Sequence, residues 1–391
     1  MEFARRFARK VEGAFILLSL KEDEARVHKG GIDFDFVGFT DLDDDLRRRD
    51  FTINAIAYDL KEERIYDPFL GQKDLKRKLL RPVDRGSLEL DPLRILRGFR
   101  FSLELGFKLD PAFFYQARSV SLKGIAGERI WMEFSRILKQ ECFKVIGKLD
   151  ELGCLVDMMP EIEPLQKSPY WQHSLLTLKY IETAIKEPIL KDLEPEYHDY
   201  LGIDFRIPIL KLAGLLHDLA KPHTRFEKDG EVHFYGHDTL GSQIAKGIGK
   251  ERLRLSNQET KLLTRLIKEH MRPHLLCGGE LTDRAIRRFL RDLGDDFIGA
   301  MILAWADGKA TAGKTRHLKK LYKRIITFYR IEKEKASFKR LINGYDLIEL
   351  GLKPGPIFKQ ILNEVEEQQR DGLIKTKAEA IALAKKLIEE V

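Results

Sequence analysis

The sequence predicts an α+β protein that is predominantly α-helical, with a mixed head followed by a long helical region. Segments of strand composition lie within the first 80 residues, for example residues 14–20 and the alternating apolar and acidic residues 32–37. Beyond residue 87 strand signals become scarce and helical patterns take over. The first of these helices begins at Asp91 and Pro92, a favourable pair for an N-cap and first helical turn.

The head is expected to alternate strands with short helices. Apolar residues recur at near-helical spacing in residues 3–11, before the first strand. Thr40 and Asp43 form a capping box for a short helix. Residues 64–75 have the composition of a strand that leads into a Pro/Gly turn. A helix, three strands and a second helix are therefore expected before the helical region begins.

Four regions are expected along the 391 residues. They are a partial mixed head (1–86), a helical neck that binds nucleotide and RNA (87–160), a helical domain (161–318) and a helical tail (319–391). Three prolines between residues 160 and 169 separate the two central regions. The tail begins with a basic run and ends in Lys/Glu-rich amphipathic helices.

The composition favours a polyanionic partner and a reducing compartment. The net charge of +7 suits RNA, because Lys and Arg neutralise phosphates and release counterions. Cys142, Cys154 and Cys277 form neither a C-x-x-C pair nor an even-numbered framework, which is typical of a cytoplasmic protein. No run approaches the ~20 apolar residues of a membrane span. A membrane protein is therefore not expected.

Histidines and aspartates of the third region form a candidate metal centre. Imidazole and carboxylate groups are ligands for divalent cations such as Mn²⁺, Fe²⁺ or Ni²⁺. The candidate ligands are His173, His217, Asp218, His237, His270 and Asp307. The alternative for any one of them, such as His217, is a buried histidine without a metal. Six positions in this order favour the metal centre.

This order resembles the HD phosphohydrolase superfamily. The resemblance implies that His173, His217, Asp218 and Asp307 bind one divalent transition metal ion, Mn²⁺, Ni²⁺ or Fe²⁺. It implies that His237 and His270 hold a second ion, and that Lys221 faces a substrate phosphate. His217, Asp218 and Lys221 are then the catalytic residues. Three further histidines are expected at the surface or on the phosphate side: His223, His233 and His274.

Three stretches of the first third carry a second resemblance. They are R-R-D-F-T-I-N-A (48–55), D-P-F-L-G-Q-K-D-L (67–75) and L-D-P-L-R-I-L-R (90–97). They resemble the nucleotide-handling motifs of the class II tRNA nucleotidyltransferase (CCA-adding enzyme) and bacterial poly(A) polymerase family. Leu70 replaces a usual glycine and Leu90 a usual glutamate. The resemblance implies a nucleotidyltransferase-type head, ATP and CTP as nucleotides, and the tRNA 3′ end as partner.

The same resemblance implies seven nucleotide contacts: Arg48, Arg49, Asp50, Asn54, Asp91, Arg94 and Arg97. Asp91 and Arg94 match the pair that selects the base, since a carboxylate accepts from an exocyclic amine and a guanidinium donates to ring acceptors. Arg94, Arg97 and Arg100 recur at helical spacing and are expected to meet a triphosphate or an RNA backbone. The alternative is a merely solvated face.

The metal-binding carboxylates of that family have no counterpart among residues 1–30. Family members carry these carboxylates as D-x-D after a G-G-x-V-R-D turn, just before the helix and strand that the opening residues resemble, and Mg²⁺-dependent nucleotidyl transfer requires such carboxylates. Asp33 and Asp35 lie on one strand face, but Asp33 matches a later acidic strand that supplies a third ligand. We therefore expect Mg²⁺ only if the missing carboxylates are supplied. A head without its first strand should expose a sheet edge and apolar surface, with a loosely ordered N-terminus or a partner there.

Three hypotheses remain open from the sequence. The first is a CCA-adding or poly(A)-polymerase-like enzyme with an HD domain, whose sequence here begins at an internal methionine. The second is a metal-dependent HD phosphohydrolase or phosphodiesterase whose degenerate head docks RNA or nucleotide. The third is a split enzyme in which a separate chain supplies the missing strand. CCA addition and poly(A) addition use the same motifs, so the sequence does not separate them.

Overall fold

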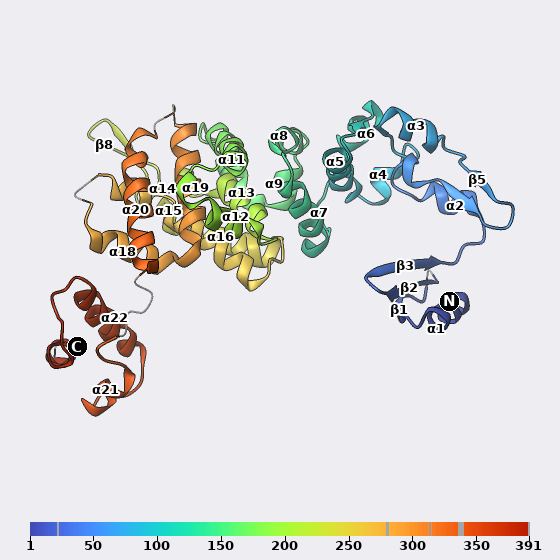
Figure 1. Cartoon of the computed structure of the whole chain (residues 1–391). Helices are drawn as coiled ribbons and strands as arrows, with labels where there is room; N and C mark the ends of the chain where they lie inside the picture. Colours follow the sequence, from blue (N-terminus) through green and yellow to red (C-terminus); the bar gives the residue numbers. More distant parts are fainter. Residues whose placement is uncertain (22, 279–280, 312, 314, 335–339, 390–391) are drawn as a thin grey trace. The chain divides into compact units, whose positions relative to one another are not determined.

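The structure is a computed structural model that describes residues 1–391 except 22, 279–280, 312, 314, 335–339 and 390–391. The chain forms two compact units, Met1–Ile125 and Ala126–Val391 (Figure 1). The predicted α+β, mostly helical fold with a mixed head is confirmed. The boundary between the units falls inside the predicted region 87–160, and the division into four regions stays a prediction.

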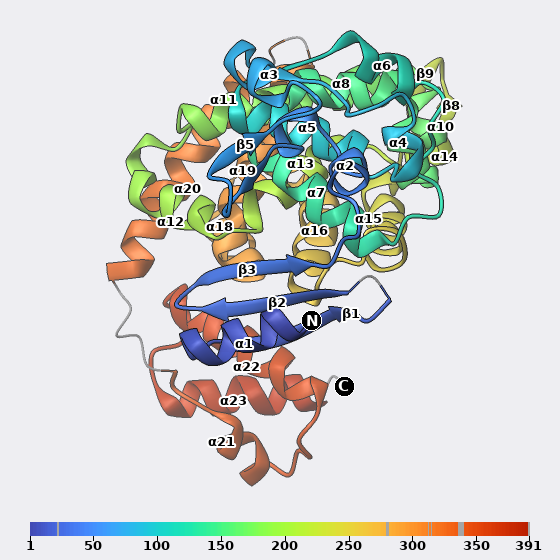
Figure 2. The ribbon, with the colours of Figure 1, turned by 90° about the vertical axis from the view of Figure 1, so that its right-hand side faces the viewer.

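The first unit begins with a helix that packs on a three-stranded antiparallel sheet in the order β1-β2-β3 (Figure 2). The Phe7 ring contacts Phe34 and Phe36 at centroid distances of 5.1 and 5.2 Å. Gly30 and Gly31 both have positive φ in the turn between β2 and β3, which suits a two-residue hairpin. The elements are α1 (Glu2–Val11), β1 (Ala14–Ser19), β2 (Glu24–Lys29) and β3 (Ile32–Val37).

The predicted sheet edge and exposed apolar surface are present in this sheet. β1 pairs with β2 and with no other described strand, and Ile16, Leu17 and Leu18 are exposed. Residues 2–11 form a regular helix, so the predicted loose order of the N-terminus is wrong, and the alternative, a partner at this edge, stays a prediction.

The rest of the first unit packs around α5 (Arg94–Leu105). Its Phe99 is buried against Phe113 at 5.4 Å, and a Cβ on Gly98 would lie within 3 Å of Phe113 and Phe51. The remaining elements are α2 (Leu42–Arg47), η1 (Thr52–Asn54), β4 (Ala57–Asp59), β5 (Arg64–Tyr66), α3 (Gly71–Arg77), β6 (Leu79–Leu80), α4 (Ser87–Leu90), β7 (Lys108–Leu109) and α6 (Pro111–Ala117).

Two helix starts differ from the predictions. α2 is capped by Asp41, whose side chain accepts from the Asp44 N–H at 3.0 Å, so the predicted Thr40 cap is wrong by one residue. The regular part of α5 begins at Arg94 instead of Pro92. Asp91 nevertheless accepts from the Leu93 N–H at 3.3 Å. The N-cap of α2 is therefore Asp41, one residue closer to the helix than the predicted Thr40.

The second unit is helical apart from one hairpin, β8 (Phe226–Lys228) and β9 (Glu231–His233), which was not predicted. Its central helix, α13 (Arg206–Leu216), is buried from Pro208 to Leu216 and packs most extensively against four other helices. They are α7 (Gly127–Lys139), α11 (Trp171–Lys186), α16 (Asn257–Glu269) and α19 (Phe297–Ala310). α13 therefore forms the middle of the helical core.

The other elements surround this core. They are α8 (Phe143–Glu151), α9 (Cys154–Met158), η2 (Pro160–Ile162), α10 (Glu163–Gln166), η3 (Lys191–Leu193), α12 (Glu194–Gly202), α14 (Lys221–Thr224), α15 (His237–Gly247), η4 (Ile248–Arg252), α17 (Arg272–Leu276), α18 (Asp283–Leu293), η5 (Gly294–Asp296), α20 (Arg316–Glu334), α21 (Gly344–Glu349), α22 (Pro356–Arg370) and α23 (Lys377–Glu389). Among the described residues, no helix has both the length and the apolar composition to cross a bilayer.

Candidate active sites

A cavity of 320 Å³ in the first unit gathers all seven residues predicted to contact nucleotide. Three of the residues follow α2, one lies in η1, and three lie at or near the start of α5. The lining consists of Arg48, Arg49, Asp50, Asn54, Asp91, Arg94 and Arg97. Two sequence motifs about forty residues apart therefore form one concave surface rich in guanidinium groups.

Asp50 joins the two halves of this cavity. Its side chain is 6% exposed and accepts from the Phe51 N–H at 2.8 Å, from Asn54 Nδ2 at 2.9 Å and from Arg97 Nη2 at 2.5 Å. Burial by itself raises the pKa of Asp50, but the Arg97 charge and the hydrogen bonds outweigh it and lower that pKa. The carboxylate therefore stays ionised and holds Arg97 against η1.

Arg94 is fixed by backbone acceptors. Its Nη1 donates to the carbonyl and the hydroxyl of Ser87, each at 2.9 Å, and its Nη2 donates to the Arg48 carbonyl. Burial lowers the pKa of Arg94, while nearby Asp50 and Asp91 oppose that shift. These contacts fix the orientation of the Arg94 guanidinium near Asp91. A fixed orientation is what a donor–acceptor pair needs in order to recognise the hydrogen-bonding edge of a base.

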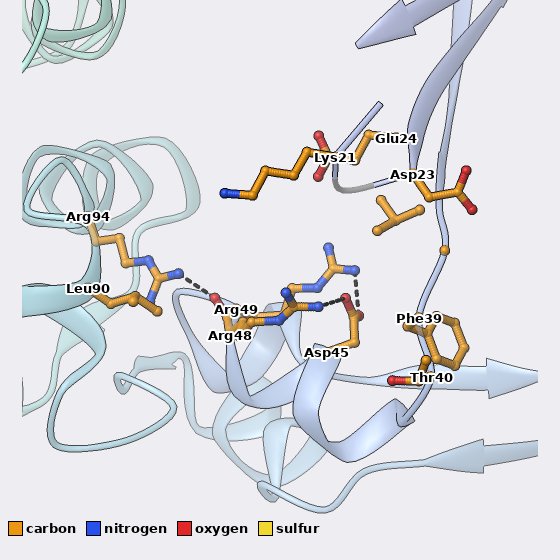
Figure 3. Close-up of a pocket in the computed structure, with 12 residues that line it drawn as sticks. Lys21, Asp23, Glu24, Phe39, Thr40, Asp45, Arg48, Arg49, Leu90 and Arg94 are labelled. Carbon is orange, nitrogen blue, oxygen red and sulfur yellow. Dashed lines mark hydrogen bonds and ion pairs between the residues drawn. The ribbon is translucent and has the colours of Figure 1, made fainter. Parts of the chain in front are cut away.

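A second cavity of 740 Å³ shares Arg48, Arg49 and Arg94 with the first and adds charged residues that sequence reasoning missed (Figure 3). Asp45 accepts from Arg49 at 2.8 Å and lies 3.7 Å from Arg48. The spacing of three and four residues along α2 was a usable signal for these pairs. The other charged lining residues are Lys21, Asp23 and Glu24.

Asp33 and Arg100 lie in different surroundings from those predicted. Asp33 accepts from His28 at 2.6 Å on an exposed face of the sheet, and it belongs to neither cluster of potential metal ligands found among the described residues. Arg100 is 4% exposed, donates to Glu104 at 2.6 Å and lines neither cavity. The prediction that Arg100 joins Arg94 and Arg97 on an open face is wrong, because helical spacing gives direction but not depth.

The six predicted metal ligands of the second unit converge into two triads. One is His173, His217 and Asp307, the other Asp218, His237 and His270, and within each the ligand atoms lie within 4.8 Å of one another. Asp218 connects them. Its Oδ2 lies 3.3 Å from His217 Nε2, and its Oδ1 lies 3.7 Å from His237 Nε2. The geometry suits two neighbouring divalent cations that share one carboxylate.

Backbone carbonyls orient three of these imidazole rings. Nδ1 of His217, His237 and His270 lies 2.9, 2.8 and 2.6 Å from the carbonyl three residues earlier in each case. A proton on Nδ1 satisfies that contact and leaves the Nε2 lone pair to face the centre. Burial, with the nearby charge of His217, lowers the pKa of His270 to about 4, so this ring is neutral near pH 7.

Asp218 shows that the residues fit a cation. Its side chain is 1% exposed and neither oxygen accepts a hydrogen bond, although Lys221 Nζ lies 2.7 Å away. A buried carboxylate without hydrogen bonds is costly unless a cation neutralises it. Four imidazoles with Nε2 atoms nearby supply nitrogen ligands of the kind that divalent transition metals prefer.

His274 is a member of this centre that sequence reasoning placed at the surface or on the phosphate side. Its Nε2 lies 3.2 Å from Asp307 Oδ2, without hydrogen-bond geometry, and its Nδ1 lies 3.0 Å from His317 Nε2. His274 follows His270 by four residues, one helical turn, which was the available signal.

Comparisons with known proteins identify the family of the chain. Residues 18–81 match the Poly A polymerase head domain family, and residues 170–312 match the HD domain family. The A-adding tRNA nucleotidyltransferase of Deinococcus radiodurans is 32% identical over 99% of this chain and 89% of its own length. The chain belongs to the tRNA nucleotidyltransferase family. It is a nucleotidyltransferase-family enzyme with an HD domain, and both families generally use divalent metals.

Further relatives share the same architecture. The CC-adding tRNA nucleotidyltransferase of Thermus thermophilus is 28% identical over 96% of this chain and 84% of its own length. A CCA-adding enzyme solved with ATP has a TM-score of 0.65 at 21% identity, covering 97% of this chain and 81% of that one. The Thermotoga maritima CCA-adding enzyme solved with tRNA has a TM-score of 0.61 at 20% identity, covering 98% and 83%. At these identities the solved structures show the fold alone, and the predicted nucleotidyltransferase-type head with a helical remainder is confirmed.

Proposed function

We propose that this enzyme adds C or A nucleotides from CTP or ATP to the 3′ end of tRNA. The observation that carries the proposal is the cavity formed by residues 48–54 and 91–97, whose seven lining residues are the predicted nucleotide contacts. Relatives that align over nearly the whole chain are named A-adding and CC-adding tRNA nucleotidyltransferases, which supports tRNA as the substrate. The net charge of +7 favours such a polyanionic partner.

The roles follow from the hydrogen-bonding groups of the cavity. Asp91 and Arg94 select the base, because together they offer an acceptor and fixed donors to its Watson–Crick edge. Arg48 and Arg49 face the phosphates, and their guanidinium groups provide charge-assisted hydrogen bonds to phosphate oxygens. Asp50 accepts hydrogen bonds from Arg97 and Asn54 and so holds both side chains in the cavity lining.

Mg²⁺ is the ion expected for the transfer step, but the described head residues do not form a site for it. Within the first unit they include no group of three potential ligands close enough to hold an ion. We therefore derive no metal-dependent step from them.

One experiment tests this proposal with three samples. Incorporation of labelled CMP and AMP is measured on tRNAs that end before CCA, after C and after CC. The samples are the 391-residue chain, the same chain extended by in-frame upstream codons, and the chain mixed with soluble extract. Incorporation that appears only with the extension or extract, and is lost in Arg94→Ala, supports the proposal. Lack of incorporation in all three samples refutes it.

A second activity, metal-dependent phosphoester hydrolysis at the HD centre, is proposed from the two triads joined by Asp218. Mn²⁺, Ni²⁺ or Fe²⁺ bound there would polarise a phosphate ester and supply an activated water. His217 and Asp218 would hold the ion, and Lys221 would bind a phosphate oxygen next to Asp218. Hydrolysis of bis(p-nitrophenyl) phosphate with Mn²⁺ tests it, and equal hydrolysis by wild type and Asp218→Ala would exclude it.

A further inference from the structure

A basic surface lies on α3 and the adjoining strand β7, outside the linings of both cavities of the first unit (Figure 1). Its cations come from two segments that are distant in the sequence. The segments meet because the Lys108 N–H donates to the Lys78 carbonyl at 2.9 Å. Two exposed leucines, Leu70 and Leu75, lie on the same stretch of chain. The basic face is made of the exposed residues Lys73, Lys76, Arg77, Lys78 and Lys108.

The positive charge of the basic face is not compensated by any described carboxylate. None of its cations forms an ion pair with a described residue. The single acid of α3, Asp74, is buried and accepts from Thr52 Oγ1 at 2.7 Å and from Arg81 Nε at 2.9 Å. Cations that gather without carboxylates create a local positive potential, and this potential attracts a polyanion.

The spacing of the cations suits a phosphate backbone. Lys73, Lys76 and Arg77 are exposed and are three and four residues apart, so they share one side of α3, whereas Gly71 and Asp74 are buried. A rise of about 1.5 Å per residue spreads the three over about 6 Å of helix. Side chains of this length can contact successive phosphates of one strand. The face carries no aromatic ring on which an unpaired base could stack, which favours a paired stem over a single strand.

The opposite side of α3 packs directly against the nucleotide cavity. A Cβ at Gly71 would lie 2.1 Å from the Thr52 carbonyl oxygen, so α3 and η1 are in close contact. The hydrogen bond from Thr52 to Asp74 fixes this contact, and Asn54 of the same η1 lines the 320 Å³ cavity. The basic face is therefore separated from η1 by one helix, about 10–12 Å across with its side chains.

We propose that the basic face binds the phosphate backbone of a base-paired RNA stem whose 3′ end enters the nucleotide cavity. The cations supply charge-assisted hydrogen bonds to phosphate oxygens, and such contacts hold the RNA in position without reading its sequence. The inference rests on the proposed function, in which the tRNA 3′ end is the substrate, and it assigns the surface that holds the adjoining stem.

The test measures Kd of the full chain for a tRNA that ends before CCA and for its isolated acceptor-stem hairpin, between about 50 and about 200 mM KCl. Lys73→Gln/Lys76→Gln/Arg77→Gln should lower the slope of log Kd against log salt by about 2–3, because each phosphate contact contributes about 0.9. At the lower salt concentration it should weaken binding roughly tenfold or more. A variant that melts like wild type and keeps the wild-type slope would overturn the basic face.

The matched control is Arg6→Gln/Arg9→Gln/Lys10→Gln. It removes the same charge, with the same spacing, from exposed positions of α1, which packs on β1 and β2. It should leave the slope nearly unchanged. Equal losses in the two variants overturn the basic face, because net charge alone would explain them. Wild type that binds no tRNA refutes the proposed function as well, whereas tRNA binding with an unchanged slope in the α3 variant refutes the basic face alone.

Two other ligands test the kind of partner. A single-stranded oligocytidine should bind wild type and the α3 variant with equal Kd, and a loss confined to it would contradict a paired stem. Leu70 and Leu75 among cations also suit an anionic lipid surface. If the α3 variant loses binding to phosphatidylglycerol vesicles and keeps binding to tRNA, RNA is the wrong partner. The charge-conserving variant Lys73→Arg/Lys76→Arg/Arg77→Lys should keep the wild-type slope, and its loss in a protein that melts like wild type would contradict charge-based contacts.

Discussion

The nucleotide cavity and the HD centre of this chain satisfy their buried carboxylates in opposite ways. Asp50 in the cavity accepts hydrogen bonds from Phe51, Asn54 and Arg97, all within the protein. Asp218 in the HD centre is as deeply buried but accepts none. Protein hydrogen-bond donors thus satisfy the first carboxylate, whereas the second has the Lys221 ammonium at 2.7 Å and a set of imidazole nitrogens around it. The first arrangement holds neighbouring side chains in place, and the second is the one proposed to hold a divalent cation.

The largest expected effect is the loss of metal from Asp218→Ala. This substitution removes the carboxylate shared by the two triads. Metal affinity should fall by more than the ~10–100-fold that loss of an outer-shell partner causes. Metal content after dialysis against Mn²⁺ measures it. Retention of both metal ions would contradict the assigned ligands.

Asp50→Ala should behave in the opposite way and destabilise the protein directly. It removes the carboxylate that accepts hydrogen bonds from Arg97 and Asn54. Breaking a buried pair costs about 3–5 kcal/mol, and the partial exposure of Arg97 places this case near 3 kcal/mol. The change in the free energy of unfolding is measured by urea denaturation. Asp35→Ala is the control, since its pair with Arg26 is exposed to solvent and should contribute little to stability.

Alanine substitutions of two glycines, one next to each site, should also differ in how much they destabilise the protein. A Cβ at Gly98 would lie 2.5 Å from Phe113 and 2.9 Å from Phe51, both buried rings. Gly98→Ala should therefore cost about 1–3 kcal/mol of unfolding free energy by overpacking. A Cβ at Gly214 would meet the terminal methyl of Ile181, which can rotate away. Gly214→Ala should therefore cost less, and equal losses would contradict this reading of the packing.

The smallest expected effect is a pH dependence from Asp50. Because its folded-state pKa is lowered, its contribution is present above the unfolded-state value of about 3.9 and lost as pH falls through the folded value. The stability difference between wild type and Asp50→Asn should be largest near pH 6 and narrow below about pH 4. Urea midpoints across this range measure it. A difference that widens at low pH would contradict the direction of the shift.

Sequence reasoning located both sites because their residues lie in short motifs. The seven cavity residues fall in two stretches of seven residues each, and the HD ligands follow in a recognisable order. It missed contacts that depend on packing. The approach of His274 to Asp307 requires α17 to lie against α19, which no local pattern encodes. The burial of Arg100 was also missed, because helical spacing alone does not show whether a helix face is exposed to solvent or packed against the rest of the protein.

The carbonyl contacts of the metal-ligand histidines have a consequence for assembly. Gly214, Phe234 and Ile267 each orient a ring only three residues further along the same stretch of chain. Each of these three rings therefore takes its direction from its own turn of the chain and not from a neighbouring helix. Tertiary folding then only has to bring preset donors to a common point. We expect the centre to tolerate substitutions between the helices better than changes within these three turns.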